Sequence, residues 1–322
     1  MTRADDQTQA LHLATYSGWY RFEKRDQQWN QTDKALTFWK MTSLQVDPED
    51  ARHLYIATEH SGLFITKNGG ADWQRAKPNV PRLTTTSLLA LPGVILAGTV
   101  PAALYHASNG SGWQELEGVR LGATGGSFPP SPELGARTRF LAADNETPRR
   151  LYAAIEVGGM LVSDDGGRQW TAATKGLDDP DVHQILPSAK TQGLVVAACG
   201  EGAYRSTDRG KDWKNVTPPG NRTFGSAVGE DASGTIYLAM ALGRPNTWLR
   251  KERASAALFV SQDGAHWDIA VEGLRGGIMA MCPGDQGVFA STSEGEVVHV
   301  DSSGSRTIIS GLPSITAIAL AA

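Results

Sequence analysis

Three side chains combine acid–base chemistry with positions where predicted strands begin or end: Glu59, Glu156 and His183. Because histidine titrates near neutral pH and burial can raise the pKa of a glutamate, a glutamate and an imidazole that meet can exchange protons with a substrate. We therefore predict all three as catalytic candidates. The alternative, that Glu156 and His183 merely satisfy each other or nearby backbone, stays open.

Side chains suited to holding a substrate occupy similar positions; they are Tyr16, Trp39, His60, Arg139, Arg222 and Trp248. An arginine such as Arg222 can orient an anionic group. The rings of Trp39 and Trp248 can form platforms for a sugar ring or an aromatic ligand. Packing of these two rings beneath loops is an equally open interpretation.

Motifs for common cofactors are absent from the sequence. It contains no Gly-x-Gly-x-x-Gly before a helix, no Walker sequence and no Cys-x-x-Cys, and its histidines lack metal-ligand spacing. We therefore expect neither a cofactor nor a catalytic metal. Acid–base chemistry without them leaves hydrolysis, elimination, isomerisation and cyclisation.

The bulk composition is typical of a soluble globular protein. The 322 residues are 40% hydrophobic and 20% charged, with a net charge of −4, so neither nucleic acid nor an anionic membrane is expected as a partner. No apolar stretch is long enough for a membrane helix, and the N-terminus lacks the pattern of a secretory signal. Cys199 and Cys282 lie in apolar segments, as buried reduced thiols do, and we expect a cytoplasmic protein.

The candidate residues must be positioned by the fold, and the sequence shows a repeated unit in which each copy ends in a tryptophan. Similar phrases end at Trp29, Trp73, Trp113, Trp170, Trp213 and Trp267, of which Ser163-Asp-Asp-Gly-Gly-Arg-Gln-Trp170 is a clear copy. In such a phrase the serine and aspartate side chains can bond turn amides, and glycine tolerates a positive φ, so each copy predicts a β-hairpin turn. Three further short strands accompany each turn, which predicts a four-stranded propeller blade.

The ends of the chain decide the number of blades. The first blade lacks an inner strand, and the terminal segment Ile315–Ala321 has the pattern of one. Docking that segment into the first blade closes the ring without a free sheet edge. We therefore predict an all-β, seven-bladed propeller of antiparallel blades, spanning residues 1–322 as one domain. The expected blades are 11–32 with 314–321, 42–76, 84–117, 138–173, 181–216, 224–271 and 276–310.

The repeated phrase resembles the Asp-box, or BNR repeat, of sialidase-like propellers (S/T-x-D-x-G-x-x-W). Further phrases, including Asp181-Val-His183, resemble bacterial BNR propellers labelled glycosyl hydrolases. This resemblance implies that the box is a structural turn at the blade rim and is not catalytic. Sialidases carry an Arg-Ile-Pro-like motif, whereas Arg21-Phe22-Glu23 lies in a predicted third strand, so classical sialidase activity is not expected.

The predicted turns divide the propeller into two faces. With strands A to D counted outward from the axis, the boxes are C–D turns, and the B–C and D–A turns share the opposite face, here called the mouth face. Insertions at 118–137 and 243–250 onward fall on this face. The B strands end there at Tyr16, Glu59, Val100, Glu156, Gly200, Ala241 and Ser293. Because these residues differ from blade to blade, a functional site is expected where they meet.

The function expected from these features is cofactor-independent acid–base catalysis on a small molecule or glycan at the mouth of the central channel. Glu59 and Glu156 lie two blades apart, which is too far for a paired-carboxylate mechanism. Hydrolase, lyase, isomerase and cyclase chemistry therefore all stay open. The alternatives are a propeller that binds a ligand without chemistry and a scaffold for protein partners, as in the similar photosystem II assembly propellers.

Overall fold

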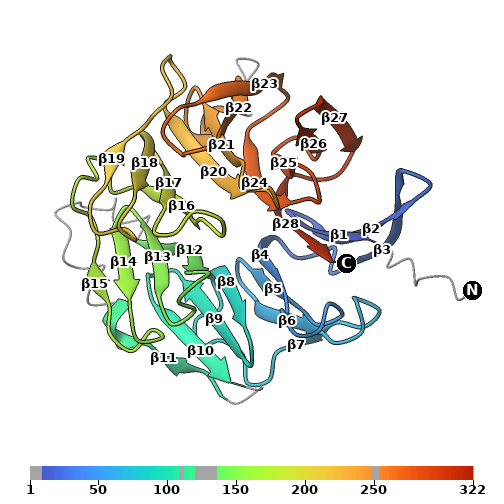
Figure 1. Ribbon diagram of the computed structural model, residues 1–322. Coiled ribbons are helices and arrows are strands. Elements are labelled where there is room, and N and C mark those ends of the chain that lie inside the picture. Colours follow the sequence, from blue (N-terminus) through green and yellow to red (C-terminus); the bar gives the residue numbers. More distant parts are fainter. Residues whose placement is uncertain (1–8, 109–111, 120–135, 249–253, 322) are drawn as a thin grey trace, which may run out of the picture.

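The computed structural model describes residues 9–108, 112–119, 136–248 and 254–321, and it forms seven four-stranded antiparallel sheets around a central axis (Figure 1). The predicted fold class is therefore confirmed. Blade 1 contains β28 (Ile315–Ala321), β1 (Ala10–Thr15), β2 (Gly18–Arg25) and β3 (Gln28–Ala35). Within the described ranges, no helix is long and apolar enough to cross a membrane.

The other six blades run in chain order, each from its inner to its outer strand. Blade 2 has β4 (Met41–Val46), β5 (Leu54–Thr58), β6 (Gly62–Thr66) and β7 (Gln74–Arg75), and blade 3 has β8 (Thr85–Leu91), β9 (Val94–Thr99), β10 (Leu104–Ser108) and β11 (Gln114–Glu115). Blade 4 has β12 (Arg137–Ala143), β13 (Leu151–Glu156), β14 (Gly159–Ser163) and β15 (Thr171–Ala172). Blade 5 has β16 (Val182–Pro187), β17 (Val195–Cys199), β18 (Gly202–Ser206) and β19 (Lys214–Asn215). Blade 6 has β20 (Phe224–Glu230), β21 (Ile236–Ala241), β22 (Ala256–Ser261) and β23 (Asp268–Leu274), and blade 7 has β24 (Ile278–Pro283), β25 (Val288–Thr292), β26 (Val297–Asp301) and β27 (Gly304–Ile309).

The ring closes within blade 1, as expected. Strand β28 pairs antiparallel with β1, from Ala321 opposite Ala10 to Ile315 opposite Thr15. The second strands of the blades are mainly apolar, because each blade packs against a neighbour on both sides; β5, β17 and β21 are buried at every residue. The core is thus a ring of apolar layers between blades, such as the layer of Tyr152 and Val195 between blades 4 and 5.

The repeated turns have the hydrogen bonds that their residue types predict. The Ser163 hydroxyl accepts from the Gly167 amide at 2.8 Å, and Asp165 Oδ1 accepts from the amides of Arg168 and Gln169, both at 2.9 Å. Gly167 has a φ of 91°, a conformation that favours glycine. The serine and aspartate side chains of this turn are therefore engaged in holding the hairpin.

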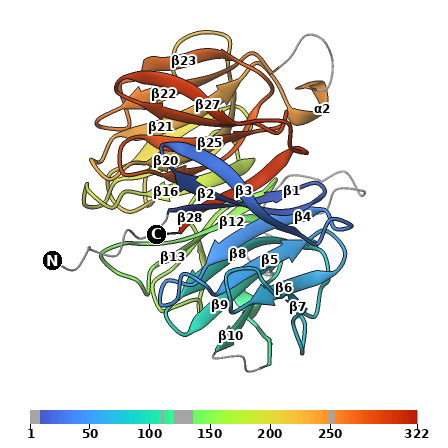
Figure 2. The ribbon, with the colours of Figure 1, turned by 90° about the vertical axis from the view of Figure 1, so that its right-hand side faces the viewer.

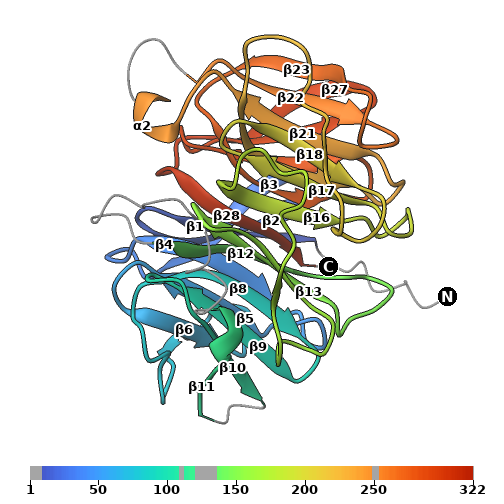
Figure 3. The same cartoon turned by 90° about the vertical axis from the view of Figure 1, so that its left-hand side faces the viewer.

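The two faces of the ring are distinguished by the short helix α2 (Pro245–Trp248), which lies in the connection between β21 and β22. In both side views α2 lies on one face, while the C-terminal end of β28 points to the other (Figures 2 and 3). Since α2 follows the second strand of its blade, its face is the mouth face. Most of the predicted insertion at 118–137, and residues 249–253 of the other, lie outside the described residues.

Candidate functional site

A β-bulge recurs in the inner strand of every blade, one residue inside the mouth face. At each bulge one residue is skipped in the ladder between the inner strand and its neighbour. The skipped residues, from blade 1 to blade 7, are Thr316, Thr42, Thr86, Arg139, His183, Ser226 and Met279. Two of the residues predicted for the site, Arg139 and His183, are therefore structurally equivalent and lie on adjacent blades.

In blades 1 to 3 the bulge residue ties one blade to the next. Thr316 Oγ1 donates to the Met41 carbonyl at 3.0 Å, Thr42 Oγ1 to the Thr85 carbonyl at 2.5 Å, and Thr86 Oγ1 to the Thr138 carbonyl at 2.8 Å. In each case the acceptor immediately precedes the bulge of the following blade. The threonine is thus a strap between inner strands, and a different residue at this position marks a departure from the structural pattern.

His183 keeps this strap through one ring nitrogen and has a second ring nitrogen that can contact another residue. Its Nδ1 lies 2.6 Å from the Gly225 carbonyl, which again precedes a bulge, and the ring is 4.7 Å from that of Phe224. Because a carbonyl can only accept, Nδ1 carries the proton, and Nε2 is left to face Asp181 Oδ2 at 3.5 Å. The side chain of His183 is only 6% exposed, so it is better placed to hold Asp181 than to reach far into solvent.

Glu156 ends β13 and is fixed by two arginines of the neighbouring inner strand. Arg137, its cross-strand partner, donates to both carboxylate oxygens, and Arg139 Nε lies 3.5 Å from Oε2. Burial alone would raise the pKa of Glu156, but the Arg137 hydrogen bonds and the charge of Arg139 outweigh it, and the net pKa is lowered. Glu156 is therefore held ionised, unlike the raised-pKa glutamate that the sequence allowed.

Glu156, Asp181 and His183 form one cluster, in which a ligand atom of each lies within 4.8 Å of the others. The expected approach of Glu156 and His183 from adjacent blades is thus found in the structure, whereas their catalytic roles stay predictions. In Asp181, burial would raise the pKa, but the His183 hydrogen bond and the charge of Arg244 lower it overall. Its Oδ1 is buried without a hydrogen-bond partner among the described residues.

This cluster is also where a metal could be held in the described part of the chain, because carboxylate oxygens and an imidazole nitrogen are metal ligands. The Nδ1–H bond of His183 to a carbonyl is the support that metal-binding histidines usually have. Arg137, however, occupies both oxygens of Glu156. A metal cation would have to displace that guanidinium. The residues therefore favour a site in which arginine, rather than a metal ion, balances the carboxylate charge.

A second polar group lies on blades 1 and 2, apart from this cluster. Glu59 Oε1 accepts from Lys40 Nζ at 2.9 Å, and the same ammonium lies 4.6 Å from the centre of the Tyr16 ring. His60 Nε2 is 3.8 Å from Glu59 Oε2, and its ring is largely exposed. Burial would lower the pKa of Arg137, but its bonded carboxylate and weaker attractions, that of Glu59 among them, raise it overall. The charge of Glu59 is thus a minor contribution to the raised pKa of Arg137.

Large exposed apolar side chains gather on the loops of the mouth face. Tyr16 is 47% exposed, Phe38 is 96% exposed and Trp39, tilted against Phe64 at 5.8 Å, is 39% exposed. Leu83 and Leu242, on further loops of this face, are also exposed. Scattered exposed apolar residues need no explanation, but the adjacent Phe38 and Trp39 make this part of the mouth face a candidate binding surface.

Trp248 and Arg222 are placed differently from the substrate-contact roles predicted for them. Trp248 is only 4% exposed, its Nε1 donates to the Gly243 carbonyl at 2.7 Å, and its ring meets Phe224 edge-on at 5.8 Å. Arg222 donates to the Ser255 carbonyl at 2.6 Å and pairs with Glu272 at 3.2 Å. Both side chains brace the connection between β21 and β22, which is the packing alternative left open for Trp248.

Two residues at this site, Arg137 and Asp181, were not predicted as site residues from the sequence. Arg137 starts β12 two residues before Arg139, and Asp181 directly precedes β16. A signal for both existed, since charged residues at the start of an inner strand must face the mouth. Their exact neighbours depend on the bulge, which has no sequence signature.

Comparison with known proteins gives a partial match in sequence and a full match in fold. No family model matches the chain. A probable oligoxyloglucan-reducing end-specific xyloglucanase from Neosartorya fischeri is 32% identical over 141 residues, which are 42% of this chain and 17% of that protein. The Asp-box family assignment therefore stays a prediction.

Among solved structures, the GH74 xyloglucanase from Xanthomonas campestris superposes with a TM-score of 0.67 at 18% identity, covering 96% of this chain and 52% of its own. YCF48 bound to D1 peptide superposes with a TM-score of 0.57 at 14% identity, covering 95% of this chain and 87% of its own. The chain thus spans about half the length of the xyloglucanase structure. These likenesses show that it shares the propeller fold with GH74 xyloglucanases over nearly all of its length.

Proposed function

We propose that the chain binds a glycan on its mouth face and hydrolyses a glycosidic bond at Glu156 and Asp181. The observation that carries this proposal is the convergence of two carboxylates and an imidazole from adjacent blades within 4.8 Å. Glycoside hydrolysis commonly uses two carboxyl groups around a positively charged transition state. The matching fungal relative is named a xyloglucanase, which makes xyloglucan oligosaccharides the first substrates to test.

Each group of the cluster has a role that its environment supports. The ionised carboxylate of Glu156 stabilises positive charge that develops at the anomeric carbon. In the form that acts, the Asp181–His183 pair carries a second proton between His183 Nε2 and Asp181 Oδ2, and this proton passes to the leaving oxygen as the glycosidic C–O bond breaks. Water then adds to the anomeric carbon, and its proton returns to the same pair. Arg137 and Arg139 are positioning residues, because they fix the carboxylate of Glu156.

The exposed rings on blades 1 and 2 supply the binding part of the proposal. A sugar presents a C–H face that packs on an aromatic ring, and Trp39 and Tyr16 offer such rings on the same face as the cluster. Glu59, Lys40 and His60 lie beside them and can bond sugar hydroxyls. A chain of several sugar units would therefore extend from the rings toward Glu156.

The test measures release of reducing ends from xyloglucan oligosaccharides and of nitrophenol from p-nitrophenyl glycosides. Glu156→Gln and Asp181→Asn preserve shape and are expected to lower kcat at least about 100-fold, the usual minimum for general acid–base groups. Trp39→Ala is expected to raise KM with a smaller effect on kcat. Glu294→Gln, an exposed glutamate on the same face in blade 7, is the control and retains activity.

Two outcomes would overturn the proposal. One is full activity in both Glu156→Gln and Asp181→Asn, which would place the chemistry elsewhere. The other is no turnover and no binding of any glycan by the wild type, together with a protein that co-purifies and is lost on Phe38→Ser. That second result would establish the scaffold alternative.

A further inference from the structure

An aspartate–tyrosine pair recurs on the face opposite the mouth, where the first and second strands of alternate blades are joined. The tyrosine hydroxyl donates to an aspartate Oδ2 in blades 2, 4 and 6: Tyr55 to Asp47 at 3.0 Å, Tyr152 to Asp144 at 3.5 Å and Tyr237 to Asp231 at 3.3 Å. The residue two positions before each tyrosine varies, being His53, Arg150 and Thr235. This variable position faces the groove between one blade and the next.

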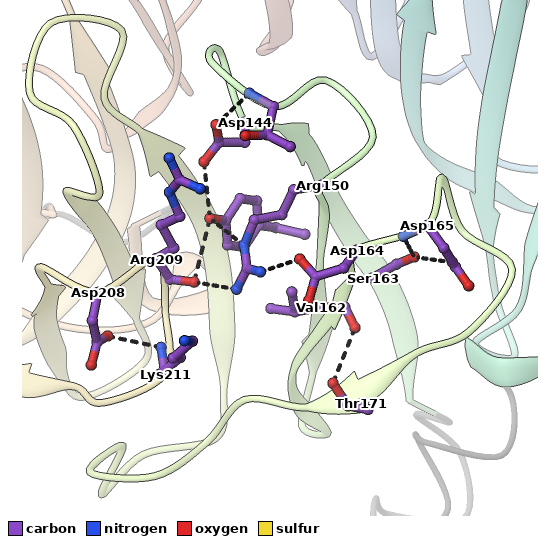
Figure 4. Close-up of polar contacts among 12 residues, drawn as sticks. Asp144, Arg150, Val162, Ser163, Asp164, Asp165, Thr171, Asp208, Arg209 and Lys211 are labelled. Carbon is purple, nitrogen blue, oxygen red and sulfur yellow. Dashed lines mark hydrogen bonds and ion pairs between the residues drawn. The ribbon is translucent and has the colours of Figure 1, made fainter.

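In blade 4 the variable residue is Arg150, which contacts Asp164 of its own blade and Arg209 of the next (Figure 4). Arg150 donates to the Arg209 carbonyl of blade 5 at 2.7 Å and to the Tyr152 hydroxyl at 3.1 Å, and it pairs with Asp164. It is buried, so its guanidinium closes the space between blades 4 and 5. This groove has an occupant built into the chain.

In blade 2 the same two positions hold different residues. His53 replaces the arginine, and Lys67 stands where blade 4 has Asp164, directly after the first residue of the repeated turn. The attractive Arg150–Asp164 pair thus becomes a pair of nitrogen bases that repel each other when both are charged. A cavity of about 340 Å³ opens between blades 2 and 3, lined by His53, Tyr55, Lys67, Lys77, Pro78 and Trp113 among others. That volume is at the lower end of small-molecule sites.

The hydrogen bonds of His53 show what its free nitrogen can bind. Tyr55 donates its one hydroxyl proton to Asp47, and His53 Nδ1 lies 3.2 Å from the same Asp47 oxygen. A carboxylate can only accept, so Nδ1 carries the proton. Nε2, which is buried and has no partner among the described residues, then presents a lone pair. Burial, assisted by the charge of Lys67, outweighs the opposing charge of Asp47 and lowers the pKa of His53 overall, so the ring is neutral at pH 7.

The charges around the cavity select the class of ligand. A cation would meet Lys67 and Lys77, and an anion would meet Asp47 and Glu49. A neutral ligand with hydroxyl groups avoids both conflicts, donates to His53 Nε2 and accepts from the lysines. Trp113 and Pro78 provide apolar walls for the C–H face of such a ligand.

We propose that the cavity between blades 2 and 3 binds one neutral sugar unit, and that the buried Nε2 of His53 reaches one of its hydroxyls through a small turn of the ring toward the cavity. It lies on the face of the repeated turns, so it is separate from the mouth face and does not depend on the function proposed there. The groove after blade 6 is also open, but there Thr235 Oγ1 is bonded to Gln262 at 3.1 Å and Ser233 at 2.9 Å. Its variable residue therefore has no unmet hydrogen bond.

The test titrates the protein with methyl β-D-glucopyranoside, methyl β-D-xylopyranoside and methyl α-D-mannopyranoside while NMR follows the ring nitrogens of His53 and the indole of Trp113. A saturable change at His53 Nε2 is expected with at least one sugar. The double variant His53→Arg with Lys67→Asp recreates the blade 4 pair and fills the cavity, so affinity is expected to fall at least about tenfold. Thr235→Val, in the groove after blade 6, is the matched control and keeps wild-type affinity.

Two controls separate sugar binding in the cavity from activity at the mouth face and from loss of folding. Glu156→Gln is expected to bind these sugars in the cavity as the wild type does, so failure at the mouth face leaves this result intact. The thermal midpoint of the double variant shows that it folds. The proposal is overturned if no sugar saturates the signal, if the double variant binds equally well, or if methylammonium or acetate produces the same change as the sugars.

Discussion

Acid is expected to loosen the closure of the ring through His12. This residue lies in β1 opposite Ala319 of β28, and its ring is stacked on Trp19 with centroids 5.7 Å apart. Its Nδ1 is buried without a hydrogen-bond partner among the described residues. Burial, assisted by the charge of Arg21, lowers the pKa of His12 to about 3. A proton can therefore be taken up readily only when the chain unfolds.

The size of the effect follows from proton linkage. Below pH 6.5 the unfolded chain binds a proton at His12 that the folded chain does not bind until about pH 3, so stability falls as the pH falls through this window. At pH 4.5 the loss is about 2.7 kcal/mol, from about 1.36 kcal/mol for each of two pH units. Above pH 6.5 neither state binds the proton and the contribution vanishes. The loss is large beside typical stabilities of about 5–15 kcal/mol.

The measurement is urea unfolding at pH 7.5 and 4.5, followed by tryptophan fluorescence, for the wild type and His12→Leu. Leucine costs stability at both pH values, but it cannot titrate, so only the difference between the two pH values matters. The wild type is expected to lose about 2.7 kcal/mol more than His12→Leu. His53 is present in both proteins and cancels, and His266→Gln, which alters an exposed ring, serves as the control. Equal losses in the wild type and His12→Leu would refute the reasoning.

Three further changes test the contacts described above. Arg137→Gln is expected to raise the pKa of Glu156, because a cation that hydrogen-bonds the carboxylate is lost; a carboxyl NMR titration unchanged from wild type would contradict this. Arg150→Ala leaves the Arg209 carbonyl and Asp164 without their donor and is expected to cost about 1–3 kcal/mol in urea unfolding, whereas the exposed neighbour Arg149→Ala costs almost nothing; equal costs would count against the role of Arg150 in joining blades 4 and 5. Deleting residues 314–322 exposes the edge of β1 and is expected to abolish cooperative unfolding by circular dichroism, and a sharp native-like transition would show that closure is dispensable.

The fold could be predicted because its signals are local and repeated. The serine, aspartate and glycine of each turn phrase have one hairpin conformation that satisfies them all, as at Ser163 and Gly167. Strand β28 could be assigned to blade 1 because an apolar strand without a partner must find the one incomplete sheet. Both inferences need only residue types and their order.

The site could be predicted only in part, because its details depend on backbone irregularity. Glu156 and His183 meet because Glu156 ends one strand and His183 lies at the start of another on the same face, which the sequence order shows. The bulge that sets the direction of His183 and Arg139 is occupied by threonine, arginine, histidine, serine or methionine, and so leaves no pattern. The burial of Trp248 depends on Gly277, where any Cβ would collide with the indole.

The seven bulges also have a consequence for how such a protein can be changed. A residue skipped by the ladder has no partner in strand pairing, so its side chain can be exchanged while both strands keep their register. His183 is an example: its Nδ1 still bonds the next blade, while its Nε2 faces Asp181 and is not needed for the strap. Ser226 and Met279 form no strap among the described residues, so they are two positions on neighbouring blades where a side chain can be replaced. Reactive groups could be installed there one at a time, around an axis that already holds them at regular intervals.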